Sequence, residues 1–267
     1  MHVQRISASS YSNTAPLVWS FLFGQNHGKV EIILDTAPSR SAQLLCEDRV
    51  DAALVPVIAY QMLDGVSLVP EVCVGARARV RSVCLVTNGI DLKDVRSVAL
   101  DTSSLTSANL SKIIFREFVG LDPVWVEHEP DLGKMLKGFD CALLIGDPSL
   151  TIDENIYRKF DLVEVWRSFT GLGFVFAMWM TKRSHCMIDF VEARNEGLAH
   201  IDDIVANYET DLRLKPEDLK TYLSENISYS IDQTMQKGLD EYFRLAAKHG
   251  LIAENKPLRF LDQNKPD

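Results

Sequence analysis

Residues 4–23, QRISASSYSNTAPLVWSFLF, join a short apolar run to a polar turn and then to an apolar helical pattern. Gln4–Ala8 predicts a strand, and residues 9–16 predict a turn rich in hydroxyl and amide groups. Pro16 suits the first turn of a helix, and the apolar pattern carries that helix to Phe23. Strand, turn and helix in this order are the unit of largely parallel α/β sheets. The start of the chain therefore predicts an α/β fold.

The same alternation continues outward from this unit to about residue 180. The predicted strands are Gln4–Ala8, Val30–Leu34, Ala52–Pro56, Val83–Thr87, Ser97–Leu100, Val124–Glu127, Cys141–Ile145 and Phe174–Met180. The helices predicted between them are Pro16–Phe23, Arg40–Glu47, Ser107–Val119 and Asp131–Lys137. After about Ser184 the pattern is helical throughout, over Met187–Tyr208, Pro216–Glu225 and Asp232–Lys248.

This layout predicts two lobes with a cleft between them. The chain builds one α/β lobe, crosses into a second, and returns to the first with terminal helices. Lobe one is predicted to hold residues 1–85 and 178–267, and lobe two residues 86–177. A length of 267 residues is enough for both lobes to have hydrophobic cores.

The composition and charge of the chain argue against some classes of binding partner. A formal net charge of −9 argues against binding to nucleic acids or anionic membranes, which requires a positive surface. The first ten residues lack the pattern of a signal peptide, and no apolar run reaches the roughly 20 residues that span a bilayer. The five cysteines lie in apolar segments without a Cys-x-x-Cys pair, which indicates reduced core residues. These features predict a cytoplasmic protein, and nothing in the sequence indicates its oligomeric state.

Three polar turns precede helices and are candidate anion sites. Uncommitted N–H groups at helix starts bind anions, and ligands of open α/β sheets lie at the carboxyl ends of strands. Each turn can equally be a capped helix start, with Asn13 or Thr14 as the first cap and Ser39 as the second. The candidate binding residues are Ser10 and Tyr11 in the first turn, Ser39 in the second, and Ser104, Thr106 and Ser107 in the third.

Other candidates stand where the chain crosses between lobes. Arg81 and Ser82 precede the first crossing strand, although Arg77, Arg79 and Arg81 can instead form one solvated strand face. Asp147 either lines the cleft or caps the segment after it. Thr170 and Gly171 precede the return strand, where close backbone approach and core packing are both plausible. The six histidines lack metal-ligand spacing, and no nucleotide-binding loop is present, so no metal or cofactor is predicted.

Together these segments resemble the chorismate dehydratases of the futalosine pathway to menaquinone. The points of resemblance are residues 11–17 (YSNTAPL), 38–39 (PS), 51–57 (DAALVPV), 81–83 (RSV), 100–107 (LDTSSLTS), 142–147 (ALLIGD) and 170–177 (TGLGFVFA). The family's usual Tyr-Leu-Asn is Tyr-Ser-Asn here, and its Thr-Gly-Leu-Pro is Thr-Gly-Leu-Gly. The resemblance implies a type-II periplasmic-binding-protein-like fold and no cofactor. It also implies a hydro-lyase that converts chorismate, a dianion, into 3-[(1-carboxyvinyl)oxy]benzoate and water.

The candidate catalytic residues for such a reaction are Asn13, Ser82 and Asp147. Two alternatives remain open from the sequence. The sister family that makes dihydroxynaphthoate has a Cys-Pro-Asn-Asp stretch in its first turn and a catalytic His in lobe two. This chain has Ser12-Asn13-Thr14 there, and His128 is its only histidine in the predicted second lobe. The other alternative is a protein of the same fold that binds a small anion without catalysis.

Overall fold

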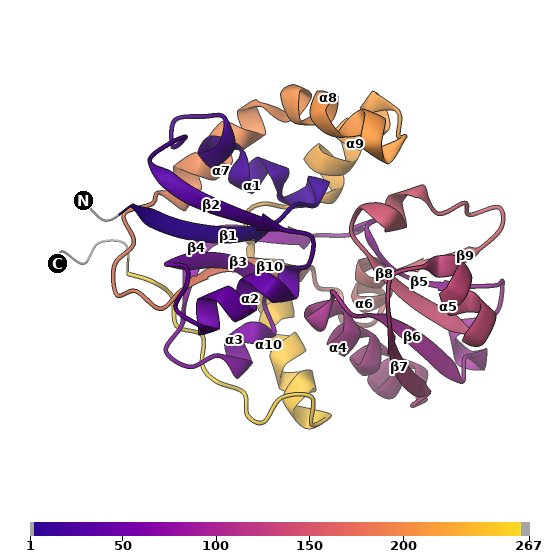
Figure 1. Cartoon of the computed structure of the whole chain (residues 1–267). Coiled ribbons are helices and arrows are strands. Elements are labelled where there is room, and N and C mark those ends of the chain that lie inside the picture. Colours follow the sequence, from indigo (N-terminus) through magenta and orange to yellow (C-terminus); the bar gives the residue numbers. More distant parts are fainter. Residues whose placement is uncertain (1–2, 263–267) are drawn as a thin grey trace.

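The computed structural model describes residues 3–262 and contains two five-stranded sheets, one in each half of the molecule (Figure 1). The first sheet has the strand order β2-β1-β3-β10-β4. β1 is parallel to β2 and β3, whereas β10 is antiparallel to β3 and β4. Its strands are β1 (Gln4–Ser9), β2 (Val30–Asp35), β3 (Ala52–Pro56), β4 (Ser67–Ala76) and β10 (Phe174–Thr181).

The second sheet has the order β7-β6-β8-β5-β9 and the same plan. β6 is parallel to β7 and β8, whereas β5 is antiparallel to β8 and β9. Its strands are β5 (Val83–Thr87), β6 (Ser97–Asp101), β7 (Val124–His128), β8 (Cys141–Ile145) and β9 (Arg158–Asp161). The chain crosses between sheets in residues 77–82 and returns in residues 171–173, so the predicted boundaries at 85 and 177 fall inside β5 and β10.

Helices cover both sheets, and the last one touches both halves. α7 packs against α1, while α10 packs against β10 in the first half and α4 in the second. The Tyr242 hydroxyl of α10 donates to the carbonyl oxygen of Thr106 in α4 at 3.0 Å. The α-helices are α1 (Ala15–Leu22), α2 (Pro38–Cys46), α3 (Ala59–Met62), α4 (Leu105–Ile113), α5 (Leu132–Gly138), α6 (Leu162–Thr170), α7 (Phe190–Ala199), α8 (Ile201–Leu212), α9 (Pro216–Thr221) and α10 (Gln233–Lys248). The remaining helical segments are η1 (Ser12–Thr14), η2 (Leu92–Asp94), η3 (Ile114–Val119), η4 (Asp147–Thr151) and η5 (Tyr222–Asn226).

Several elements differ from the sequence prediction for local reasons. β4 was not predicted, because Pro70 and Gly75 argue against a central strand; β4 is an edge strand, where proline is tolerated. β9 and α6 were also missed. The helix predicted over Met187–Tyr208 is two helices, which meet at His200 with non-helical backbone angles.

Most apolar side chains of both halves form one continuous core, and a smaller cluster lies in the second half. Three of the five cysteines are buried, but Cys46 is exposed and Cys186 is only partly buried, so the prediction of core positions was wrong for these two. Within residues 3–262, no helix has both the length and the apolar character needed to cross a bilayer.

Candidate functional site

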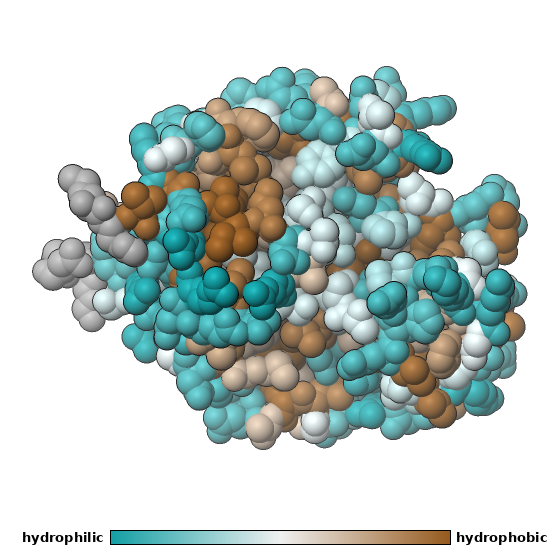
Figure 2. Space-filling view, in the orientation of Figure 1, coloured by the Kyte–Doolittle hydropathy of each residue, from teal (hydrophilic) through white to brown (hydrophobic). Residues whose placement is uncertain are grey.

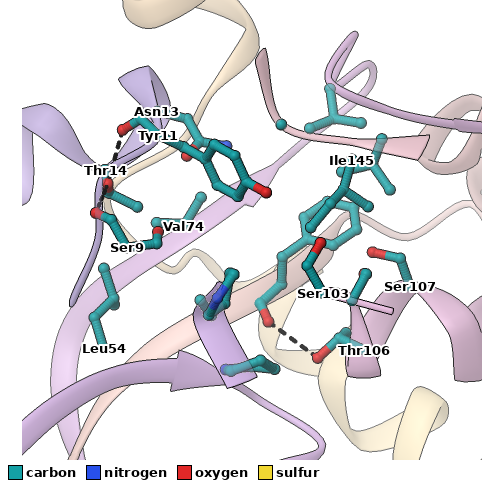
Figure 3. Close-up of a pocket in the computed structure, with 18 residues that line it drawn as sticks. Ser9, Tyr11, Asn13, Thr14, Leu54, Val74, Ser103, Thr106, Ser107 and Ile145 are labelled. Atoms are coloured by element: carbon teal, nitrogen blue, oxygen red, sulfur yellow. Dashed lines mark hydrogen bonds between the residues drawn. The ribbon is translucent and has the colours of Figure 1, made fainter. Parts of the chain in front are cut away.

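A cavity lies between the two sheets, and the space in and over it, open solvent included, is about 600 Å³ (Figure 3). The cavity meets the carboxyl ends of the parallel strands β1, β3, β6 and β8, where ligands of open α/β sheets bind. It is lined by Ser9, Tyr11, Asn13, Thr14, Pro38, Leu54, Pro56, Val74, Val80, Val83, Ser103, Ser104, Thr106, Ser107, Ile145, Gly146, Phe176 and Ala177.

The lining is uncharged. All of these residues are described, and none of them is Lys, Arg, His, Asp or Glu. The polar groups of the lining are hydroxyl groups and one amide. The apolar residues around them include residues of β3, β4, β5 and β10. In Figure 2 the surface over the junction of the two halves is pale, the shade of residues with intermediate hydropathy. An anion in this cavity would be held by neutral donors rather than by salt bridges.

The turn after β1 is closed by its own threonine. The Thr14 hydroxyl donates to the carbonyl oxygens of Ser9 at 2.6 Å and Tyr11 at 2.8 Å. Thr14 is the N-cap residue of α1, as one of the two predictions had it, but no side chain makes a capping hydrogen bond there. Since the threonine holds the turn, the Asn13 amide is left on the cavity wall, as Figure 3 shows.

Asp147 joins the second half of the molecule to this same turn. Its carboxylate accepts hydrogen bonds from the Ser12 N–H at 3.1 Å and from the Ser12 hydroxyl at 2.5 Å. Burial raises the pKa of Asp147, and the two bonds from Ser12 oppose that effect. Asp147 is close to the site but does not line the cavity, because its oxygens face Ser12.

Tyr11 lies across the junction from Gly146. A Cβ atom at Gly146 would come within 2.8 Å of the Tyr11 ring, so glycine is required for the two halves to approach this closely. Gly146 also has a φ of 68°, a conformation that favours glycine. Burial raises the pKa of the Tyr11 hydroxyl, and the nearby Ser103 side chain opposes this. Tyr11 thus forms one wall of the cavity and touches both halves.

The turn after β6 is held by a different carboxylate. Asp101 accepts from the Ser103 N–H at 2.9 Å, from the Ser103 hydroxyl, and from the Ile145 N–H at 3.4 Å. Ser104 is the residue before α4, and no side chain caps this helix. The first N–H groups of a helix have no intrahelical partner, so the start of α4 presents donors at the cavity.

The structure brings the three predicted residues of this turn together. Ser104, Thr106 and Ser107 all line the cavity. The Thr106 hydroxyl donates to the carbonyl oxygen of Phe176 at 3.2 Å and accepts from the Ile58 N–H at 3.4 Å. Thr106 therefore ties α4 to the first sheet, which leaves Ser104 and Ser107 as the better placed hydroxyl groups for a ligand.

Several other predicted residues lie outside the cavity lining. α2 begins at Pro38, which lines the cavity, and Ala37 is its N-cap residue, so Ser39 is not a cap. Ser10 is half-buried, and its carbonyl oxygen accepts from the Tyr208 hydroxyl at 3.2 Å. The Thr170 hydroxyl donates to the carbonyl oxygen of Trp166 within α6. Gly171 ends α6 with a φ of 72° and borders a separate hollow beside Arg79 and Arg167.

Arg81 and Ser82 occupy the first crossing, behind the cavity wall. Arg81 has a φ of 63°, and its guanidinium pairs with Asp218 at 3.0 Å. The N–H groups of Val80 and Arg81 donate to Asp161 at 3.0 and 2.6 Å. Asp161 also caps α6, and burial raises its pKa. Ser82 is fully buried, between the cavity-lining residues Val80 and Val83.

Sequence reasoning missed the apolar walls of the cavity. Leu54, Val83 and Phe176 look like ordinary core residues of buried strands, and Val74 and Val80 lie where no strand was predicted; no signal in the sequence separates the five from the rest of the core. Asp161 was missed because β9 was missed. Within the described chain, no group of three His, Cys, Asp or Glu side chains is arranged to hold a metal ion.

The two lobes and the cavity between them form a periplasmic-binding-protein-like fold. The periplasmic aliphatic sulphonate binding protein SsuA of Escherichia coli superposes with a TM-score of 0.64 at 14% identity, covering 99% of this chain and 95% of that one. A protein from Archaeoglobus fulgidus gives a TM-score of 0.72 at 16% identity, covering 93% and 98%. At these identities the likeness concerns the fold alone.

The sequence comparisons show the family. A family model described as menaquinone biosynthesis matches residues 4–248. The chorismate dehydratase of Thermus thermophilus is 30% identical over 255 residues, which cover 87% of this chain and 91% of that protein. The chain belongs to the menaquinone biosynthesis family.

Proposed function

We propose that this protein is a chorismate dehydratase, a hydro-lyase that forms 3-[(1-carboxyvinyl)oxy]benzoate and water. The observation that carries the proposal is the uncharged cavity, with hydroxyl donors from the α4 start on one side and the Asn13 amide on the other. The 30% identity to a chorismate dehydratase supports the choice of substrate.

The chemistry requires loss of a ring proton and of the neighbouring hydroxyl group. The ring carboxylate is conjugated through the diene and can take up the developing negative charge. Aromatisation then drives the departure of the hydroxyl. The proton and the hydroxyl together make the water that is released, so no other reactant is needed.

The base in this proposal is the enolpyruvyl carboxylate of the substrate. No carboxylate or imidazole lines the cavity, and the carboxylate of Asp147 faces Ser12. A substrate folded back over its own ring can deliver its carboxylate to the adjacent proton. Orientation of this kind can lower a barrier by several kcal/mol. The Asn13 amide offers both a donor and an acceptor to fix that carboxylate or to steady the leaving hydroxyl.

Incubation of the purified protein with chorismate tests the proposal. Chromatography is expected to show the carboxyvinyloxy-benzoate without any added metal or cofactor. Binding of chorismate without turnover would instead indicate a receptor, and indifference to chorismate would favour the sister activity. His128 does not line the cavity and contacts the carbonyl oxygen of Glu129, which gives no support to a catalytic His in the second half.

A further inference from the structure

Tyr222 carries a buried hydroxyl group that the protein does not satisfy. It is the first residue of η5, and its side chain is fully buried. Within the described chain its hydroxyl has no hydrogen-bond partner of acceptable geometry. Because the large majority of buried polar side-chain atoms are paired, an exception requires an explanation.

The neutral polar groups beside this hydroxyl are two of the candidate catalytic residues. Burial has the largest effect on the pKa of Tyr222 and raises it, as does the Asp147 carboxylate, whereas Ser82 and Asn13 lie close enough to lower it. The hydroxyl nevertheless forms a well-shaped bond with neither. The Ser82 hydroxyl reaches the carbonyl oxygen of Val80 only at 3.5 Å, the outer limit of a hydrogen bond. The polar groups of this cluster thus retain capacity for stronger hydrogen bonds.

The surroundings hold Tyr222 in place. The Arg81 guanidinium lies 6.0 Å from the centre of its ring and is itself paired with Asp218. Ser82 is fixed on the other side, since its carbonyl oxygen accepts from the Gly146 N–H at 2.7 Å. Asn13 faces the cavity, so the three side chains connect the core beneath η5 to the substrate space. A fixed hydroxyl behind a cavity-lining amide is suited to orient that amide.

We infer that Tyr222 is a positioning residue for the elimination, and that it acts through Ser82 and Asn13. The inference rests on the proposed function. When chorismate enters, the Tyr222 hydroxyl donates into the Ser82–Asn13 pair and aligns the Asn13 amide with the reacting groups. Tyr222 supplies no proton to the products, because the ring proton and the departing hydroxyl already make up the water.

Tyr222→Phe tests this, because it removes only the hydroxyl. An unpartnered buried hydroxyl contributes no hydrogen bond to stability, so the melting temperature should hold or rise. We expect kcat for chorismate to fall about tenfold, the value of roughly one hydrogen bond, with little change in KM. Tyr229→Phe is the matched control: Tyr229 is also buried with an unpartnered hydroxyl and lies near Tyr222, but Ser82 and Asn13 are not among the groups acting on it. Its kinetics should equal those of the wild type.

A double-mutant cycle with Ser82→Ala separates alignment from an independent effect. If Tyr222 acts through Ser82, the two losses in kcat will combine to less than their product. Wild-type kcat in Tyr222→Phe, an equal loss in Tyr229→Phe, or fully multiplicative losses in the cycle would overturn the inference and leave the proposed function standing. A wild-type protein that does not dehydrate chorismate would overturn both.

Discussion

The turn after β1 and the turn after β6 have similar residues, but the protein itself occupies an N–H donor of the first and leaves the helix start after the second open. Both follow a parallel strand, precede a helix and border the cavity. At the first turn, Asp147 from the other half of the molecule accepts a hydrogen bond from the Ser12 N–H. At the second, Asp101 binds within its own half and leaves the start of α4 open. Because a carboxylate of the protein already accepts from the first turn, we propose that the second turn binds one of the two carboxylates of chorismate.

The other helices sharpen this difference. α5, α6, α7 and α10 begin at aspartates whose side chains accept from backbone N–H groups, and these aspartates do not line the cavity. α1, α2 and α4, whose starts border the cavity, have no side-chain cap; α3, α8 and α9 also have none, so what sets the cavity apart is that no aspartate cap borders it. An aspartate cap satisfies a helix start and adds negative charge there, and both effects would weaken binding of an anion.

The largest expected effect concerns the first turn. Asn13→Ala should lower kcat by about 100-fold or more. Without the Asn13 amide the substrate is no longer oriented for the elimination, and the barrier rises by several kcal/mol. KM for chorismate should change far less, since the donors at α4 remain. Steady-state kinetics check this, and a near-normal kcat would assign Asn13 to packing alone.

The second effect concerns the open helix start. Ser107→Ala should lower kcat/KM about ten- to a hundredfold, because a hydrogen bond to a charged group is worth about 1.5–3 kcal/mol. Ser111→Ala, one turn further along α4, is the control, because its hydroxyl donates to the carbonyl oxygen of Ser107 inside the helix. An unchanged kcat/KM in Ser107→Ala would place the carboxylate elsewhere.

The third effect concerns the connection between the two halves. If Asp147 only holds Ser12 by hydrogen bonds and is not a base, Asp147→Asn should lower kcat by less than about tenfold. The amide oxygen of the variant can still accept a hydrogen bond from Ser12. A general base would lose roughly 10²–10⁴-fold. A loss of that size in a variant that still binds chorismate would make Asp147 the base and contradict substrate-assisted catalysis.

The smallest effect concerns a capped helix away from the cavity. Asp232 caps α10, and despite burial its bonds from Thr234, Met235 and Arg77 hold its pKa to about 2. A carboxyl group whose pKa is lower in the folded state than in the unfolded state stabilises the fold at pH values above its unfolded pKa of about 4. This stabilisation is lost as the pH falls towards the folded pKa of about 2. Asp232→Ala should reduce the free energy of unfolding by about 1 kcal/mol at neutral pH. Denaturant unfolding measures this, and kcat should not change.

The sequence by itself determined the α/β class, the two-lobed order and the three polar turns. Hydrophobic periodicity and turn chemistry are local properties, so strands such as Ala52–Pro56 and Cys141–Ile145 were predicted within their observed bounds. The resemblance in the turns also identified Tyr11, Asn13, Ser104, Thr106 and Ser107, all of which line the cavity.

Only the tertiary structure decided how these groups are used. Whether a hydroxyl caps a helix, closes a turn or faces a ligand depends on which partner lies within about 3 Å, and that partner comes from distant sequence. Ser12 and Asp147 are 135 residues apart, and Thr106 and Phe176 are 70 apart. Tyr222, in the C-terminal segment, meets Asn13 from the first turn only after the chain has crossed between lobes twice. Local pattern could not place such pairs, because folding brings their distant segments together: within the first lobe for Tyr222 and Asn13, and between the two lobes for the other two pairs.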